Sequence, residues 1–303
     1  MIGATALHPD HQVKNPERRG LRKGLYLIPS VFTAANIGMG FYAVMAAVRG
    51  FQFIGGGEQD LIHASTYLDN AAKAIGWAVL FDMLDGRIAR MTKTTTEIGV
   101  QLDSIADVVT FGLAPAVLAY VWGFGAVLKE RSDLHQLAWF LAFMYLMCGA
   151  FRLARFNVQA SRPRILAEGT KKVDKKSFVG LPIPVAGGLI AAIIHFNPLP
   201  LLYYGPERAK IYSLLLMALV GLLSVLMVST LRFSSFKTVG TRSRSMRTII
   251  LAVAVGMLLF LYSRQVLLVL VVSYILYGLL SRVVGVFRKR PDLSETKIEA
   301  EQM

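Results

Sequence analysis

The stretches Asp82-Met-Leu-Asp85-Gly86-Arg87-Ile-Ala89-Arg90 and Gly99-Val-Gln-Leu-Asp103-Ser-Ile-Ala-Asp107 place four carboxylates inside segments that hydropathy marks as membrane helices. One Asp at the centre of a membrane helix costs roughly 2.5 to 3.5 kcal/mol, so four unpaired acids near one level would cost on the order of 10 kcal/mol. A divalent cation among them would offset this cost. The two stretches therefore indicate a membrane protein with a metal site suited to phosphate chemistry.

The apolar segments of the chain predict an all-α integral membrane protein. Hydrophobic residues make up 54% of the 303 residues, and several apolar runs reach the roughly 20 residues that a helix needs to cross the bilayer core. An even number of spans places both termini on one side of the membrane. Hydropathy predicts eight transmembrane helices, at 27–49, 67–91, 97–122, 136–158, 179–197, 209–230, 247–262 and 265–286.

The distribution of positive charge predicts the orientation. Of the 33 Lys and Arg residues, 26 lie on the side of the N-terminus, six lie on the other side, and Lys73 lies within a span. Cytoplasmic loops carry the excess of Lys and Arg in membrane proteins, so both termini are expected in the cytoplasm. The net charge of +14 then faces the anionic lipids of the cytoplasmic leaflet. Nucleic acid is not expected as a partner, because the cations are spread over several loops and form no single groove-shaped patch.

The four acids are expected to face one another across a helical hairpin. Asp82 and Asp85 are three residues apart, and the second pair, Asp103 and Asp107, is four apart. Each pair therefore lies on one face of its helix. The turn between the two helices is expected at 91–96, and both pairs lie roughly 12 to 20 Å from it at 1.5 Å per residue. Small residues extend the same faces and leave space for a ligand near the backbone: Gly86, Ala89 and Gly99.

The ligand set favours a hard metal ion. All four candidate ligands are carboxylates, and no His or Cys stands at a useful spacing. Such oxygen ligands suit one or two Mg²⁺ or Mn²⁺ ions, which commonly complete their shell with substrate phosphate oxygens. A proton or cation transporter would also use buried acids. Transport is disfavoured because several apolar stretches contain no acidic residue, namely 182–196, 211–229, 248–262 and 265–280.

The acidic stretches match a known signature. Asp82, Asp85-Gly86, Ala89-Arg90, Gly99, Asp103 and Asp107 agree with the CDP-alcohol phosphotransferase family at every fixed position of its motif. Further segments resemble the bacterial CDP-diacylglycerol–serine O-phosphatidyltransferases, or phosphatidylserine synthases, within this family. These segments are Pro29–Asn36, Arg152–Asn157, Gly180–Pro184 and Ser229–Lys237. Ser30 departs from the pattern, because relatives often carry Asn after the proline.

The resemblance implies a division of the chain. Residues 25–240 would form the six-helix core of the family, and 241–290 would add two transmembrane helices that serve packing or homodimer contacts. Residues 1–24 are expected as a basic cytoplasmic tail and 291–303 as a second cytoplasmic tail. The protein would be a multi-pass protein of the bacterial cytoplasmic membrane, surrounded by membrane lipids, with its active site facing the cytoplasm.

The resemblance also implies an activity. A phosphatidylserine synthase transfers the phosphatidyl group from CDP-diacylglycerol to the hydroxyl of L-serine and releases CMP. The four acids would hold Mg²⁺ or Mn²⁺ against the diphosphate, and Asp107 would also act as general base. The positions that correspond to CDP-diacylglycerol contacts in the family are Ser30, Val31, Phe32, Thr33, Asn36, Gly86, Ala89, Arg90, Thr96 and Gly99.

The acceptor alcohol is less closely constrained. Serine carries a carboxylate, and Arg152 and Arg155 lie three residues apart on one helical face, with Asn157 nearby. These residues are the candidates for serine binding, although anchoring at the cytoplasmic surface would place arginines there as well. Other acceptors of the family are open alternatives, including those of the phosphatidylglycerophosphate and phosphatidylinositol phosphate synthase types.

Overall fold

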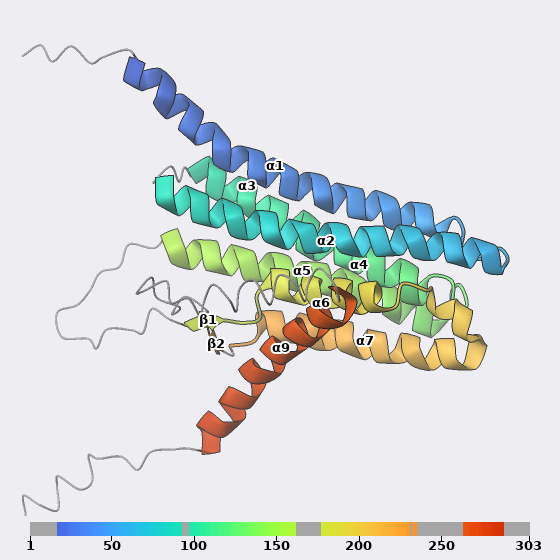
Figure 1. Ribbon diagram of the computed structural model, residues 1–303. Coiled ribbons are helices and arrows are strands. Elements are labelled where there is room, and N and C mark those ends of the chain that lie inside the picture. Colours follow the sequence, from blue (N-terminus) through green and yellow to red (C-terminus); the bar gives the residue numbers. More distant parts are fainter. Residues whose placement is uncertain (1–16, 93–96, 162–176, 231, 235–262, 288–303) are drawn as a thin grey trace, which may run out of the picture.

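The computed structural model arranges most helices side by side, and α9 crosses the others at an angle (Figure 1). The structure describes residues 17–92, 97–161, 177–230, 232–234 and 263–287. Within these ranges it describes the side chains of 31–84, 98–159, 180–230 and 263–280. The predicted span at 247–262 lies outside the described residues.

Two long helices form the first antiparallel pair, α1 (Glu17–Phe51) and α2 (Glu58–Thr92). Both extend beyond the predicted spans, because hydropathy detects only the apolar part of a helix. Residues 17–24, expected as part of a tail, belong to α1. Three of these eight residues are Arg, which favours helix, and the segment follows a proline suited to a helix start.

The third span is continuous but not uniformly α-helical. It consists of α3 (Glu97–Asp107), the π-helical turn η1 (Val108–Leu113), α4 (Ala114–Ala119) and a second π-helical turn η2 (Tyr120–Phe124). The predicted span at 97–122 agrees with these ends. The π-helical turns were not predicted. Such turns are rare and occur frequently at functional sites, and η1 begins directly after Asp107.

The remaining elements complete the bundle. They are α5 (Asp133–Ser161), the strand β1 (Ser177–Val179), α6 (Ile183–Phe196), the 3₁₀ turn η3 (Leu201–Tyr204), α7 (Pro206–Val228), the strand β2 (Arg232–Ser234) and α9 (Ser263–Phe287). Helix α5 packs along α7, and α6 packs between α2 and α9.

The two short strands are a departure from the predicted helices. β1 and β2 pair in an antiparallel manner, with Phe178 opposite Phe233. The span expected at 179–197 therefore begins only at Ile183, because Val179 lies in a strand and Gly180 adopts a left-handed conformation with φ of 82°. The fold of the described residues is otherwise helical.

Length and apolar character identify a multi-pass membrane protein. Among the described residues, five helical segments are long and apolar enough to cross a membrane: Val31–Phe51, Ile98–Phe124, Asp133–Gln159, Pro206–Val228 and Ser263–Leu280. The shorter helix α6 is also apolar. Helix α2 is not among the five, because Asp69, Lys73 and Asp82 interrupt its apolar stretch.

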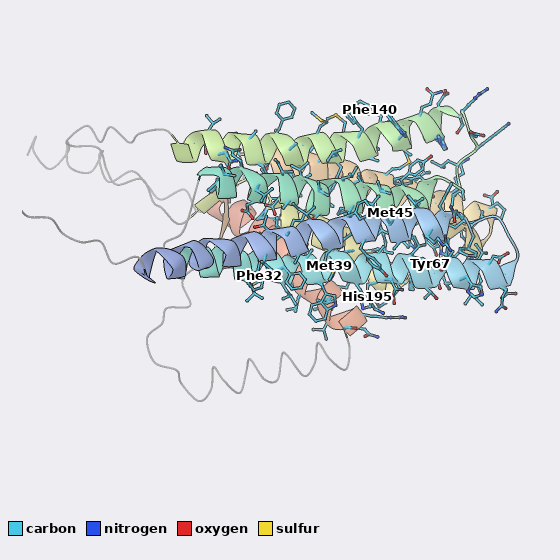
Figure 2. All side chains as sticks on the ribbon, turned by 90° about the horizontal axis from the view of Figure 1, so that it is seen from above. Phe32, Met39, Met45, Tyr67, Phe140 and His195 are labelled. Atoms are coloured by element: carbon cyan, nitrogen blue, oxygen red, sulfur yellow. The ribbon has the colours of Figure 1, made fainter. Side chains whose placement is uncertain are left out.

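Small residues let the first helices pack closely. Ala43 and Ala47 of α1 and Ala71 and Ala78 of α2 are all fully buried, and small side chains allow membrane helices to approach one another. Larger apolar side chains such as Met45 and Phe140 are half-exposed on the outer surface of the bundle (Figure 2). This arrangement is suited to lipid outside and a closely packed interior.

Candidate active site

Three of the predicted acids converge where α2 meets α3. Carboxylate oxygens of Asp82, Asp103 and Asp107 all lie within 4.8 Å of one another. Asp107 is the most buried of the three, with 8% of its surface exposed. The four-residue spacing within α3 places Asp103 and Asp107 on one helix face. This face points toward Asp82 of α2.

The geometry of this cluster fits a divalent cation. Oxygen ligands lie 2.0–2.1 Å from Mg²⁺, so two ligands on opposite sides of the ion are roughly 4 Å apart. The oxygens of Asp82, Asp103 and Asp107 are therefore at most about 0.8 Å farther apart than opposite ligands of one shared ion would be. An all-carboxylate set favours Mg²⁺ or Mn²⁺ over zinc or copper.

The other predicted residues of the hairpin are only partly described. Asp85, Gly86, Ala89 and Arg90 belong to α2, but the structure does not describe their side chains, and Thr96 lies outside the described residues. Their roles stay predictions. Gly99 lies on an exposed part of α3.

Helix α1 forms a second wall of the site. Thr33 and Asn36 are buried, whereas Val31 is 60% exposed on the outer surface and Phe32 is half-buried. The side chain of Ser30 is not described. Of the predicted α1 contacts whose side chains are described, Thr33 and Asn36 are thus the two that lie inside the bundle.

Asn36 is held next to the turn that follows Asp107. The Thr110 hydroxyl donates to the Asn36 carbonyl oxygen at 3.0 Å, and a Cβ added to Gly40 would collide with Thr110. The Asn36 side chain is 1% exposed, and neither atom of its amide has a hydrogen-bond partner among the described residues. An unpaired buried amide is costly, so this side chain indicates a position where a ligand binds.

Helix α5 forms the third wall of the site. Two hydrogen bonds fix its position relative to the third span. The Tyr145 hydroxyl donates to the Phe111 carbonyl oxygen at 3.1 Å, and the Asn157 amide donates to the Ser104 hydroxyl at 2.8 Å. Phe111 and Ser104 lie on either side of Asp107 along the third span. The part of α5 between Tyr145 and Asn157 therefore passes beside Asp107.

Arg152 lies in this part of α5. Its guanidinium interacts electrostatically with Asp107. The Nε atom of Arg152 is buried and has no hydrogen-bond partner among the described residues. Arg155 is engaged differently, because its Nη1 donates to the carbonyl oxygen of Val228, the last residue of α7, at 3.3 Å. Of the two predicted arginines, Arg152 is the one that interacts with an acid of the cluster.

Comparison with known proteins identifies the family. A model of the CDP-alcohol phosphatidyltransferase family matches residues 26–205, more than half of the chain. The chain belongs to this family. The matched segment contains all four acids of the motif as well as Arg152, Arg155 and Asn157, but it ends before α7 and α9.

Several relatives carry the same protein name. A CDP-diacylglycerol–serine O-phosphatidyltransferase of Helicobacter pylori is 30% identical over 257 residues, which cover 84% of this chain and 91% of the relative. The protein of that name from Bacillus subtilis is 32% identical over 179 residues, which cover 58% of this chain and 82% of the relative. The one from Methanocaldococcus jannaschii is 39% identical over 121 residues, 40% of this chain and 48% of the relative.

Sequence reasoning missed three residues that shape this site. Ser104, Thr110 and Tyr145 hold α1 and α5 against the third span through single hydrogen bonds. Thr110 follows Asp107 by three residues, so its place on the same helix face was a usable signal. The partners of these side chains lie between 34 and 74 residues away along the chain, and no local pattern identifies them.

Proposed function

We propose that this chain is a phosphatidylserine synthase. It transfers the phosphatidyl group from CDP-diacylglycerol to the hydroxyl of L-serine and releases CMP. The observation that carries this proposal is the convergence of Asp82, Asp103 and Asp107 beside the half-buried Arg152. The names of two relatives, of whose length 82% and 91% align with this chain, support the same reaction.

The acids bind the metal and move the proton. Asp82, Asp85, Asp103 and Asp107 hold one or two Mg²⁺ or Mn²⁺ ions, which when bound neutralise the diphosphate and stabilise the leaving CMP. Asp107 accepts the proton of the serine hydroxyl. The serine oxygen then bonds to the phosphorus that carries diacylglycerol, and the bond from that phosphorus to the CMP oxygen breaks.

The nucleotide end of the lipid substrate binds between α1 and the hairpin. The proposed contacts include Asn36, whose buried amide favours a polar ligand at this position. The full set carried over from the family signature is Ser30, Val31, Phe32, Thr33, Asn36, Gly86, Ala89, Arg90, Thr96 and Gly99. Val31 is exposed on the outer surface, so its backbone is the group proposed to take part.

Arg152 favours a carboxylate acceptor. One guanidinium forms paired hydrogen bonds with a carboxylate, whereas an acceptor that carries a phosphate would need a denser group of cations. Arg155 is already bonded to the end of α7, and Asn157 is bonded to Ser104. Arg152 is therefore the principal proposed serine contact, and Arg155 and Asn157 support it from the same helix.

We place this chemistry at the cytoplasmic face of a bacterial cytoplasmic membrane. The proposed topology has eight transmembrane helices and cytoplasmic termini. Residues 25–240 form the six-helix core. They follow a basic N-terminal segment at 1–24, of which 17–24 belong to α1, and precede two further helices at 241–290, which offer homodimer contacts; residues 291–303 form a tail. The excess of cations on the side of the termini supports this orientation.

A transfer assay tests the function. Purified protein in detergent, supplied with CDP-diacylglycerol, Mn²⁺ or Mg²⁺ and radiolabelled L-serine, is expected to form labelled phosphatidylserine and an equal amount of CMP. Parallel reactions receive labelled glycerol 3-phosphate or inositol phosphate. Labelled lipid that forms only from one of these phosphorylated acceptors would refute the serine assignment.

A further inference from the structure

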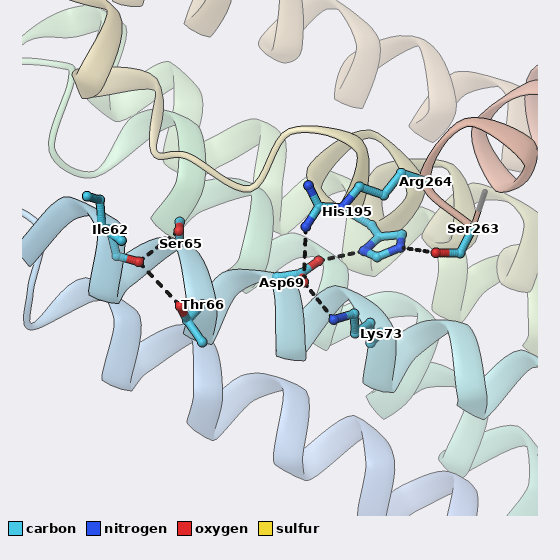
Figure 3. Close-up of polar contacts among 8 residues, drawn as sticks. All are labelled: Ile62, Ser65, Thr66, Asp69, Lys73, His195, Ser263 and Arg264. Carbon is cyan, nitrogen blue, oxygen red and sulfur yellow. Dashed lines mark hydrogen bonds and ion pairs between the residues drawn. The ribbon is translucent and has the colours of Figure 1, made fainter. Parts of the chain in front are cut away.

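A polar cluster around the buried Asp69 and His195 joins the beginning of α9 to the core. Asp69 of α2 lies at its centre, 2.5 Å from His195 Nδ1 of α6 and 2.7 Å from Lys73 Nζ. The Ser263 hydroxyl lies 3.2 Å from His195 Nε2, and Arg264 Nη2 lies 3.8 Å from Asp69 (Figure 3). Ser263 and Arg264 are the first two residues of α9, so this helix is joined to both α2 and α6.

From this anchor, α9 crosses the bundle toward the strand pair that precedes α6. It begins beside His195, near the end of α6, and packs against that helix. It also contacts β2, whose partner strand β1 ends shortly before α6 begins at Ile183. The middle of α9 therefore lies near the beginning of α6. Tyr274 follows Ser263 by eleven residues, which corresponds to about 16 Å along the helix.

The beginning of α6 packs directly against the Arg152 region of α5. A Cβ added to Gly149 would lie only 2.5 Å from Ile183 Cδ1, so the Ile183 side chain occupies the space beside Gly149. Gly149 precedes Arg152 by three residues, which is less than one helical turn. The path of α9 across α6 to β2 thus brings its middle part to the side of the site where Arg152 lies.

Tyr274 faces this side. Its ring is half-buried and packs against the hydrophobic core, and the next residue, Ile275, is buried. Tyr277, three residues further along the same helix, is 64% exposed. Tyr274 interacts electrostatically with Arg152, which in turn interacts with Asp107.

We propose that Tyr274 is a specificity-determining residue of the acceptor site, where its hydroxyl donates a hydrogen bond to the carboxylate that Arg152 binds. This inference rests on the proposed function and extends it to α9, which lies beyond the segment that the family model matches. A phenol hydroxyl is a suitable second donor, because a carboxylate oxygen accepts more hydrogen bonds than one guanidinium supplies. The polar cluster around Asp69 holds α9 in the position that the hydrogen bond from Tyr274 requires.

The test compares Tyr274→Phe with Tyr277→Phe, a matched change at an exposed position of the same helix. Steady-state transfer is measured with the full chain in detergent, with serine and CDP-diacylglycerol varied separately. Tyr274→Phe is expected to raise the serine KM by about tenfold, because a hydrogen bond to a charged group is among the stronger ones. The KM for CDP-diacylglycerol and kcat are expected to stay within about twofold, as is every parameter of Tyr277→Phe.

Two results would overturn the inference. One is an unchanged serine KM in Tyr274→Phe, and the other is an equal rise in the KM values for both substrates, which would indicate a general structural role. A wild-type protein that uses another alcohol but not serine would refute the proposed function by itself. The same pair of variants would then be compared with that alcohol, and an unchanged acceptor KM would overturn the inference.

Discussion

Replacement of Arg152 by Met is expected to remove recognition of the acceptor carboxylate while leaving the fold intact. Met is close to the apolar stem of Arg in length, and the Nε atom that it removes makes no hydrogen bond among the described residues. The change also removes the electrostatic interaction of the guanidinium with Asp107, and a melting curve in detergent measures the stability lost in the absence of substrate. In the complex with serine, the change leaves a desolvated carboxylate without its cation, which typically costs 2–5 kcal/mol or more.

This cost converts to a measurable change in the rate of transfer. At about 1.4 kcal/mol for each factor of ten, kcat/KM for serine is expected to fall between about thirtyfold and several thousandfold. Arg152→Lys keeps the charge but not the bidentate hydrogen-bond geometry, so an intermediate loss of kcat/KM for serine is expected.

The assay measures transfer to L-serine and to ethanolamine, which lacks the carboxylate. Arg152→Met is expected to lower the ratio of the two kcat/KM values by the factor lost for serine, because ethanolamine makes no contact with the guanidinium. The control is Arg208→Met, an exposed arginine near the beginning of α7, for which both rates are expected to match the wild type. Equal losses for serine and ethanolamine in Arg152→Met would refute the assignment.

Two further predictions concern the base and the helix packing. Asp107→Asn is expected to lower turnover by about 10²- to 10⁴-fold while labelled CDP-diacylglycerol still binds, and near-normal turnover would exclude Asp107 as the base. Gly187→Ala places a Cβ 3.0 Å from the Phe111 carbonyl oxygen and from Pro115 Cγ, so a loss of about 1–3 kcal/mol and a lower melting temperature in detergent are expected. Gly188→Ala meets nothing within 4 Å and is expected to preserve or raise that temperature, since Ala favours helix by roughly 0.5–1 kcal/mol; equal melting temperatures for the two variants would contradict the packing described.

Hydropathy predicted the helices well where their character is local. The span predicted at 136–158 corresponds to α5, and the one at 265–286 corresponds to α9 within two residues at its start and one at its end. The strands β1 and β2 were not predicted, because their pairing joins residues more than 50 positions apart. The π-helical turns η1 and η2 were also missed, since they depend on packing and not on residue preference.

The candidate site was predictable in part for the same reason. The spacing of Asp103 and Asp107 on one helix, opposite Asp82 on the preceding helix, is a local pattern, and the structure brings these three together. Lys73 was recognised only as a cation within a span, and its ion pair with Asp69 belongs to a cluster that also includes residues of α6 and α9. Such contacts between distant segments require the folded arrangement.

Binding of Mn²⁺ tests the central claim most directly, because it does not depend on which alcohol is the acceptor. Titration of the purified protein, followed by the electron paramagnetic resonance signal of free Mn²⁺ in the presence of CDP-diacylglycerol, measures the affinity of the acid cluster. Asp103→Asn is expected to weaken binding by more than the roughly 10- to 100-fold typical of losing an outer-shell partner. Asp133→Asn, a change at an exposed acid at the start of α5, is expected to bind like the wild type. Equal Mn²⁺ affinity in the wild type and Asp103→Asn would contradict the assignment of Asp82, Asp103 and Asp107 as a metal centre.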